Sequence, residues 1–257
     1  GRSRQALADC IAGIKRGDSE LTLETADQAG DTVLHLATGI SWREGVELLL
    51  EAGAVVNCFN HLRRTPLHNA ALRGNHHVVQ LLLQRSASAN VKDVDPDYDP
   101  RYKSASFDSN PEEHRVPLHY AAQLGNVVIM RMLLQEGSAD PNSRDSKLES
   151  PLHACLQLRE AGADLEPGCG VKLQGLQNKP AWNGRFGSVI GSRVSRDGGE
   201  PRWPVLIEGE AGVDGVLLKE ASLIRVPDEA VKLLIGARAD VNLGSSTHGE
   251  SWTILHE

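Results

Sequence analysis

A four-residue phrase ending in Leu-His recurs five times along the 257 residues of this chain, and it limits the fold more than any other feature. The phrase ends at His35, His68, His119, His153 and His256. The first and third gaps between these histidines are 33 and 34 residues, which is the period of one class of repeat. Such units stack helical hairpins side by side into a solenoid. We therefore expect an elongated helical array that holds partners.

An asparagine that closes each unit reveals two insertions. In the first three units it follows the histidine by 22, 22 and 23 residues, but in the fourth by 89. The interval from the asparagine to the next histidine is 11, 29, 11 and 14 residues. We therefore expect 18 extra residues in the loop between the second and third units and 67 inside the fourth, with the repeats resuming after both. The asparagines are Asn57, Asn90, Asn142 and Asn242.

Within a unit, the residue pattern predicts two short helices. A proline opens several of the first helices, where its missing N–H costs nothing. A turn such as Gly74-Asn75 then admits a second helix with dense apolar spacing. We expect that helix to stop at a left-handed residue, at Gly53 in one unit and Gly137 in another. Ser86 and Arg238 occupy the matching place in the other two units, where the stop is less favourable.

This arrangement resembles the ankyrin repeat. The resemblance implies two antiparallel helices and a projecting hairpin loop in each unit, stacked into a curved array over most of residues 30–159 and 227–257. It also implies that each repeat histidine hydrogen-bonds neighbouring backbone and the hydroxyl of the Thr in its phrase. Cys155-Leu156 replaces the usual pair of alanines, so we expect the fourth unit to pack differently. The residues that carry the resemblance are Thr65–Ala71 with Gly74-Asn75, Val116–Ala122 with Gly125-Asn126, Gly53–Asn57 and Ala239–Asn242.

The larger insertion has a different character. Residues 167–226 hold 11 of the 25 glycines, and short β-type runs alternate with turns. Five short strands in so small a segment indicate a small barrel, held at both ends by the helices that it interrupts. Because the interrupted turn lies at the surface, we expect the stack to stay continuous. The candidate strands are Gly170–Gln174, Gly187–Val194, Arg202–Ile207, Gly215–Lys219 and Leu223–Val226.

The glycine placement and the Arg202-Trp203 strand of this segment look like an SH3-like barrel. We therefore expect a mostly α chain: an ankyrin-type solenoid with a small inserted β-barrel. In this division residues 1–29 form a partial or capping repeat, and residues 30–159 hold repeats with a loop insertion at about 93–115. Residues 160–226 form the barrel, and the array resumes over 227–257 with a truncated last repeat. The chain begins without Met and ends one turn into a new repeat, so we interpret it as a fragment.

Charge and composition exclude several classes of function. The net charge is −7; residues 167–226 carry +2, which leaves −9 on the rest, and this argues against nonspecific nucleic-acid binding. No apolar run approaches the roughly 20 residues needed to cross a bilayer, and no secretory signal opens the chain. The four cysteines show no paired spacing, so we expect reduced thiols and a cytoplasmic or nuclear, intracellular location.

No motif in the sequence demands a metal, a cofactor or catalysis. The repeat explains the histidines, and adjacent His76 and His77 should point apart at the start of a helix. The alternate acids from Asp93 resemble the start of a calcium loop, but Tyr98 and Ser104 stand where that loop needs Gly and Glu. Gly168–Gly170 enters a strand rather than a helix, so it is no phosphate loop. The inserted loop is either a flexible acidic loop or an aromatic-bearing arm that grips a basic partner.

Three hypotheses for function remain. The first is a non-catalytic scaffold that binds a partner protein through the loop tips and the concave face of the first helices. The second is a regulatory or targeting region of a larger enzyme. The third makes the barrel a reader of peptides or modified tails through Trp182, Phe186 and Trp203, although Trp203 fits a core position better. Aromatics and arginines lead our candidates. The candidate partner-binding residues are Phe59, His61 and Arg63 on one tip, Tyr98, Arg101 and Tyr102 on the long loop, and Asn69, Arg73, Tyr120 and Gln123 on helix faces.

Overall fold

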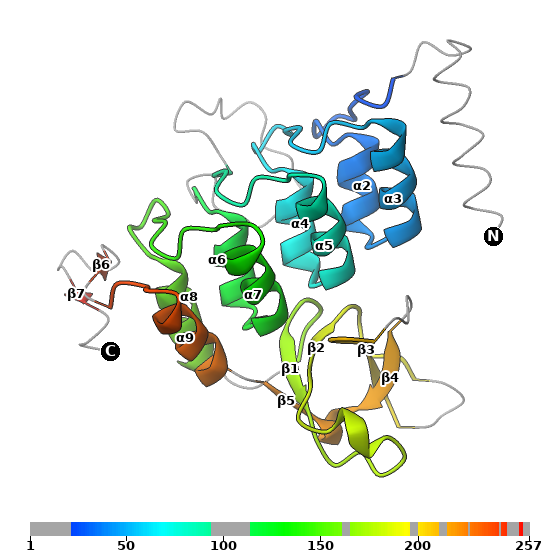
Figure 1. Cartoon of the computed structure of the whole chain (residues 1–257), viewed down its shortest axis with the longest axis vertical. Coiled ribbons are helices and arrows are strands. Elements are labelled where there is room, and N and C mark those ends of the chain that lie inside the picture. Colours follow the sequence, from blue (N-terminus) through cyan, green and yellow to red (C-terminus); the bar gives the residue numbers. More distant parts are fainter. Residues whose placement is uncertain are drawn as a thin grey trace.

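The computed structural model describes residues 22–93, 114–160, 165–195, 200–210, 215–225, 227–241, 243–245 and 252–253. In this part of the chain the helices stand in pairs that lie side by side as a two-layer stack (Figure 1). The predicted helical solenoid is confirmed. The pairs are α2 (Val33–Gly39) with α3 (Arg43–Ala52), α4 (Pro66–Arg73) with α5 (His76–Gln84), α6 (Pro117–Gln123) with α7 (Val127–Gln135), and α8 (Pro151–Glu160) with α9 (Pro227–Gly236).

Small and branched side chains explain how closely the hairpins pack. The alanine pairs of α4 and α6 are completely buried, which lets successive first helices approach each other. Leucines and valines of the second helices, such as Leu49 and Val79, fill the space between the two layers. In the fourth hairpin Cys155 takes the place of an alanine and is buried, with its thiol 3.6 Å from the carbonyl oxygen of Ala122. The fourth hairpin therefore buries a thiol where the second and third bury a methyl group; whether its packing differs stays a prediction.

The second helices end at left-handed residues, with one correction to the prediction. Gly53 has a φ of 97°, as expected. In the third hairpin the left-handed residue is Ser138, with a φ of 50°, and the prediction of Gly137 is wrong by one position. Gly137 serves another purpose, because a Cβ on it would lie 2.8 Å from a backbone carbonyl oxygen of α7. Ser86 and Arg238 take the left-handed conformation in the remaining two hairpins, with φ of 63° and 67°.

The projecting loops share one closing device. The first residue of each loop is Asp or Asn; its N–H donates to the carbonyl of the last residue at 3.0 or 3.1 Å. The last residue's N–H donates back to the side-chain Oδ1 of the first at 2.7 to 2.9 Å. Three residues separate the partners in three of these loops and 21 in the other, so the 18-residue insertion lies there, as predicted, and leaves the loop base intact. The closing pairs are Asp27 with Asp31, Asn60 with Arg64, Asp93 with Arg115, and Asp145 with Glu149.

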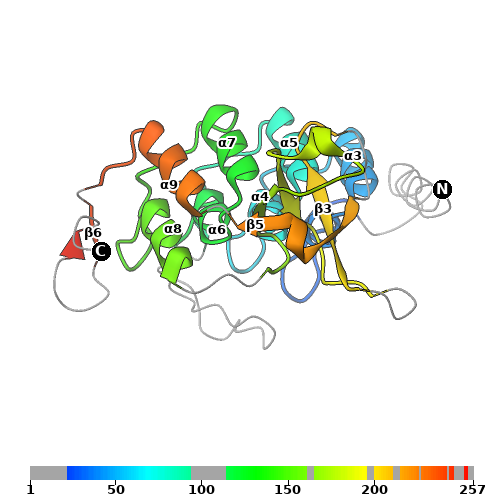
Figure 2. The ribbon, with the colours of Figure 1, turned by 90° about the horizontal axis from the view of Figure 1, so that it is seen from below.

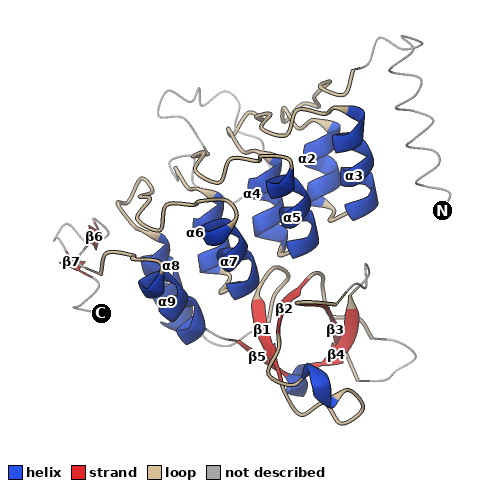
Figure 3. Ribbon diagram, viewed as in Figure 1, coloured by secondary structure: helices blue, strands red, loops and turns tan. Residues whose placement is uncertain are grey.

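Between α8 and α9 the chain forms a curled, five-stranded antiparallel sheet, a half-barrel (Figure 3). Its order is β4-β3-β2-β1-β5, so the last strand returns to pair with the first. All five strands were predicted, and β3 has the predicted bounds. Trp203 packs in the core of the sheet, as expected for its position. The strands are β1 (Gly170–Leu173), β2 (Phe186–Val189), β3 (Arg202–Ile207), β4 (Val216–Lys219) and β5 (Leu223–Arg225), with short 3-10 turns at Pro180–Trp182 and Glu220–Ser222.

After the half-barrel the chain re-enters the stack. Helix α9 begins at Pro227, as predicted, and lies against both α8 and α7. Its Ala230 and Leu234 are fully buried in the same core as Leu133 of α7. The stack is therefore continuous across the insertion. A short hairpin of β6 (Gly244–Ser245) and β7 (Trp252–Thr253) follows.

The half-barrel packs back onto the stack at the turns inside the second and third hairpins (Figures 1 and 2). Gly168 lies against Gly74, where a Cβ on Gly74 would be 2.5 Å from the Gly168 Cα. A Cβ on Gly170 would be 2.2 Å from the carbonyl oxygen of Gly125, and the Gly170 N–H donates to the Leu124 carbonyl at 3.1 Å. The glycines of the Gly168–Gly170 turn thus allow the backbones of the half-barrel and the helical stack to approach each other.

Asn126 joins this contact to the start of α7. Its Oδ1 accepts from the first turn of α7 and from the Ser188 hydroxyl, at 3.2 and 3.1 Å, and its Nδ2 donates to the Gly168 carbonyl at 2.9 Å. In the preceding hairpin Asn75 caps α5 in the same way, but its Nδ2 donates to the Ser41 carbonyl of the neighbouring hairpin, at 3.3 Å. The Gly168 carbonyl therefore accepts from Asn126 the hydrogen bond that the Ser41 carbonyl, in the turn of the first hairpin, accepts from Asn75.

Candidate functional site

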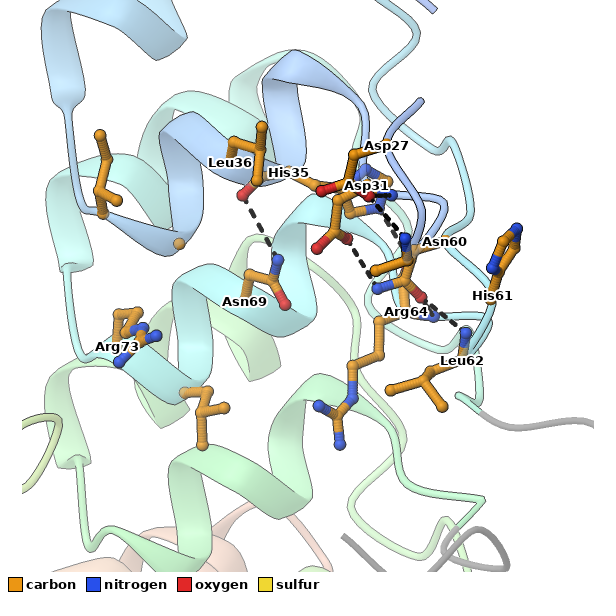
Figure 4. Close-up of a pocket in the computed structure, with 14 residues that line it drawn as sticks. Asp27, Asp31, His35, Leu36, Asn60, His61, Leu62, Arg64, Asn69 and Arg73 are labelled. Atoms are coloured by element: carbon orange, nitrogen blue, oxygen red, sulfur yellow. Dashed lines mark hydrogen bonds between the residues drawn. The ribbon is translucent and has the colours of Figure 1, made fainter. Parts of the chain in front are cut away.

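A cavity of about 330 Å³ lies between the first two projecting loops and the first helices of the first two hairpins (Figure 4). We call it the inner cavity. Residues of the projecting loops line one side of it, and residues of α2 and α4 line the other. The lining residues are Asp27, Ala29, Asp31, His35, Leu36, Gly39, Ile40, Asn60, His61, Leu62, Arg64, Asn69, Leu72 and Arg73.

The middle of the inner cavity is apolar. Leu36 and Ile40 of the first hairpin are 47% and 73% exposed, and Leu72 of α4 is half-buried beside them. Leu36 directly follows the repeat histidine, at the position that Asn69 takes in the second hairpin. Exposed aliphatic side chains that line a hollow favour the binding of another apolar group. Neither residue is among the sequence-predicted candidates; the signal in the sequence is an aliphatic side chain at a position that is polar in the next unit, Asn69 or Arg73.

Polar groups surround this apolar centre. Asp27 Oδ1 accepts two backbone N–H groups of its own loop, at 2.8 and 2.9 Å. Asp31 Oδ1 accepts from Asn60 Nδ2 of the next loop, at 2.8 Å, and Asn69 Nδ2 donates to the His35 carbonyl at 3.4 Å. These bonds hold the two loops and the two helices at a set spacing. The cavity therefore has a rigid frame made of neighbouring hairpins.

Three of the predicted site residues line the inner cavity together, namely His61, Asn69 and Arg73. Phe59 and Arg63 lie on the adjacent loop tip, both exposed, with the Arg63 guanidinium 5.2 Å from the Phe59 ring centre. Two other predictions fall elsewhere. Gln123 is exposed on α6, outside the lining, and accepts from Arg115 Nη1 at 3.0 Å. Tyr98, Arg101 and Tyr102 lie outside the described residues.

The prediction that Tyr120 faces a partner is wrong, because its side chain is only 4% exposed. Its hydroxyl donates to Asp93 Oδ2 and accepts from Arg64 Nη2, the latter at 3.0 Å. Arg64 Nε also donates to Asp93 Oδ2, at 3.3 Å. Asp93 is fully buried, and both of its oxygens serve protein donors, so it does not open a calcium loop. A long side chain from the preceding loop covers Tyr120, which spacing along one helix could not reveal.

The repeat histidines bind as the resemblance implied, with one exception. Nδ1 accepts the N–H of the residue three positions earlier, at 3.1 or 3.2 Å, so the ring proton resides on Nε2. In three units Nε2 donates to the last carbonyl of the next projecting loop, at 2.9 to 3.2 Å. The Thr or Ser hydroxyl lies 2.9 or 3.0 Å from Nδ1 for His35, His68 and His153. His119 lacks it because Val116 has no hydroxyl.

Burial favours the neutral form of three of these rings. It lowers the pKa of His35, and it lowers the pKa values of His68 and His119 to about 4. His76 and His77 do not point apart as predicted: their ring centres are 4.4 Å apart. Burial, and then the charge of His77, lowers the pKa of His76 to about 4. Among the described residues no group of three His, Cys, Asp or Glu side chains is arranged to hold a metal ion.

One Cys–His contact merits a test for nucleophilic chemistry. Cys58 Sγ lies 3.6 Å from His35 Nδ1 and 3.4 Å from the Thr32 hydroxyl. Burial raises the pKa of the Cys58 thiol and lowers the pKa of the His35 imidazole. A reactive thiolate–imidazolium pair needs the opposite shifts. Both groups are neutral at pH 7, so this contact is part of the packing between two hairpins.

Family models and curated proteins agree with this geometry. A model of three successive ankyrin repeats matches residues 8–93, and a single-repeat model matches residues 113–146.

These segments are ankyrin repeats.

Curated proteins also match part of this chain. An NAD-dependent deacetylase, sir2B, of Dictyostelium discoideum is 26% identical over 56% of the chain and 20% of that protein. The nuclear factor NF-kappa-B p105 subunit of Gallus gallus is 30% identical over 52% of the chain and 16% of that protein. The neurogenic locus notch homolog protein 1 of Homo sapiens is 28% identical over 62% of the chain and 5% of that protein. The chain thus spans a fifth or less of the length of these relatives.

The ankyrin repeats account for the placement of the inner cavity, since its loops and helices belong to the first matched segment. The barrel aromatics pack in two different places. Trp203 is buried in the sheet core and Trp182 packs, partly buried, against it, whereas Phe186 packs against the helical stack, 5.9 Å from the Arg131 guanidinium. Among the described helices, none is both long and apolar enough to span a bilayer.

Proposed function

We propose that this chain is a non-catalytic protein-interaction module whose ankyrin repeats bind a segment of a partner protein at the inner cavity and the loop tips around it. The observation that carries the proposal is the exposed apolar surface of Leu36 and Ile40 within a cavity framed by polar groups. Ankyrin repeats in general suggest a protein-binding role. Large apolar anchors that enter a framed pocket supply most of the energy of such contacts.

The loop tip next to the inner cavity extends the proposed surface. The Phe59 ring is half exposed and stacks with the Arg63 guanidinium, so both are held in place before a partner arrives. Side chains ordered in advance lose less entropy on binding. The proposal also places the protein inside the cell, where Cys58, Cys155 and Cys169, all free thiols, stay reduced. Support for a non-catalytic role comes from the neutral Cys58–His35 contact.

The test compares two substitutions of the same kind. Ile40→Asp puts a charge into the inner cavity, whereas Ile235→Asp puts one on an exposed position of α9, where Ile235 is 51% exposed. Partner proteins captured from the source cells by the wild-type chain are compared with those captured by each variant. We expect Ile40→Asp to lose a partner, by more than tenfold, that Ile235→Asp retains. A partner retained equally by both variants would contradict the proposed site.

A second function for the same module is as a regulatory or targeting region of a larger enzyme. The relative sir2B, whose name includes a deacetylase activity, favours this alternative because the match covers only a fifth of that protein. The full-length reading frame tests it. A reading frame that encodes an enzyme domain beside these repeats supports the alternative. A reading frame that encodes only further repeats rejects it.

A further inference from the structure

Apart from Arg64, whose cation is bound to buried Asp93, the charged Asp and Arg residues of the inner cavity are separated by sign along its length. Asp27 and Asp31 lie at the end formed by the projecting loops, and Arg73 lies at the other end, at the last residue of α4 (Figure 4). Leu36 lies between them in this view, and Leu72 also lines the cavity. The cavity therefore has a negative end, an apolar centre and a positive end.

Each charged group retains capacity to bind a ligand. Arg73 is exposed, and no described residue forms a hydrogen bond or ion pair with its guanidinium. Asp27 and Asp31 use Oδ1 within the protein, at 2.8 to 2.9 Å, and no described group binds their Oδ2 atoms. By contrast, the cation of Arg64 in the same lining is already bound to buried Asp93. The available charges are thus two carboxylates at one end and one guanidinium at the other.

From this arrangement we infer that the partner segment carries a basic residue, a large aliphatic residue and an acidic residue in spatial order. The basic side chain binds Asp27 and Asp31, the aliphatic one enters beside Leu36 and Leu72, and the carboxylate binds Arg73. This inference rests on the proposed function, and it names the chemistry of the partner at the same site. Complementary charges at the rim of an apolar contact set orientation and specificity.

Helix geometry gives the spacing of the two charges in the partner. Helix α4 has eight residues, so the backbone at the loop end lies about 12 Å from the backbone at Arg73, at 1.5 Å per residue. An extended segment covers that distance in about four residues, at about 3.3 Å each. A helical segment covers it in about eight residues, or two turns. The partner therefore presents its basic and acidic residues about four positions apart if extended, or seven to eight if helical.

Two substitutions and a control test the charge pattern. Asp27→Asn removes a charge but keeps the oxygen that closes the loop, because Asn60 closes the next loop with the same bonds. Arg73→Glu reverses the sign at the other end. Arg85→Glu is the control for the charge change, since Arg85 is exposed on the same hairpin but is absent from the lining of the cavity.

The experiment selects a phage-displayed library of random 16-residue peptides against the whole wild-type chain and each variant. We expect the wild-type chain to enrich peptides with the basic–aliphatic–acidic order, whose binding Ile40→Asp weakens at least tenfold. Arg73→Glu should replace the acidic preference by a basic one, and Asp27→Asn should weaken the basic preference. Arg85→Glu should leave both preferences unchanged.

Two other results would each overturn the inference, and they differ in what they leave standing. Peptides that depend on Ile40 but show no charge order, or a selection that Arg73→Glu leaves unchanged, would reject the charge pattern while keeping the proposed function. Enriched peptides insensitive to Ile40→Asp, or no enrichment at all, would reject the inner cavity as a binding site and the inference with it.

Discussion

Gly74 and Gly168 face each other across the junction between the helical stack and the half-barrel, and the space leaves no room for a side chain on Gly74: its Cβ would lie 2.5 Å from the Gly168 Cα. A Cβ on Gly168 would in turn lie 2.6 Å from the carbonyl oxygen of Leu72. Leu72 also lines the inner cavity. The half-barrel and the inner cavity therefore both lie against Leu72 of α4.

Gly168→Ala tests this close contact. The substitution introduces strain at a φ of 98° and a clash with the Leu72 carbonyl. Gly184→Ala is the control, because Gly184 has a similar φ of 84° but nothing within 4 Å of its Cβ. We expect Gly168→Ala to lower the free energy of unfolding by about 1 to 3 kcal/mol more than the control. Hydrogen exchange should also become faster in the turn around Gly74. Equal losses for the two variants would show that the clash is relieved at no cost.

Asn126→Ala tests the bond between the half-barrel and α7. Removing the side chain that caps a helix lowers stability by about 1 kcal/mol. Asn75→Ala in the preceding hairpin removes the same kind of cap and so measures this loss. Each Nδ2 also donates to a carbonyl, but Asn75 serves the half-buried Ser41, whereas Asn126 serves the buried Gly168 and also accepts from the buried Ser188 hydroxyl. We expect Asn126→Ala to cost about 1 to 3 kcal/mol more than Asn75→Ala in urea unfolding, because those groups lose a partner. A smaller effect than that of Asn75→Ala would contradict the role of Asn126 in the junction.

Tyr120→Phe tests the buried polar cluster of Arg64, Asp93 and Tyr120. The variant keeps the ring but removes the hydroxyl that lies between the guanidinium and the carboxylate. We expect a loss of about 1 to 3 kcal/mol in stability, since two buried charged groups each lose a hydrogen bond. Binding at the inner cavity should change less than twofold, because the hydroxyl is covered. A binding loss with intact stability would restore Tyr120 as a contact residue.

Stability should fall as the pH is lowered from about 6.5 to about 4. Burial holds the folded-state pKa values of His68 and His119 at about 4, below the ordinary value of 6.5. The unfolded state therefore binds more protons in this window, so the stabilisation is complete above pH 6.5 and lost towards pH 4. Urea midpoints measured across the window check the prediction. His119→Gln should flatten the dependence; an unchanged slope in this variant would contradict the prediction.

The sequence predicted the repeated parts of this molecule well because each depends on local spacing. The Leu-His phrase predicted the first helix of each of the four described hairpins, and the asparagine spacing predicted the insertion between Asp93 and Arg115. The five strands followed from alternation and turn residues. The site was predicted only in part: His61, Asn69 and Arg73 meet in the inner cavity, but Tyr120 is covered by Arg64. Ile40 was missed because its exposure depends on what the neighbouring hairpins leave uncovered.

The amino-acid sequence alone determined the helical hairpins, the length of each repeat and the place of the insertion in the fourth hairpin. These features follow from bonds within one repeat or between neighbouring repeats. Only the tertiary structure decided where the half-barrel lies and which side chains remain accessible. Both depend on contacts between residues far apart in the chain, such as Gly168 with Gly74 and Tyr120 with Arg64. No periodicity encodes such contacts, because each is made once.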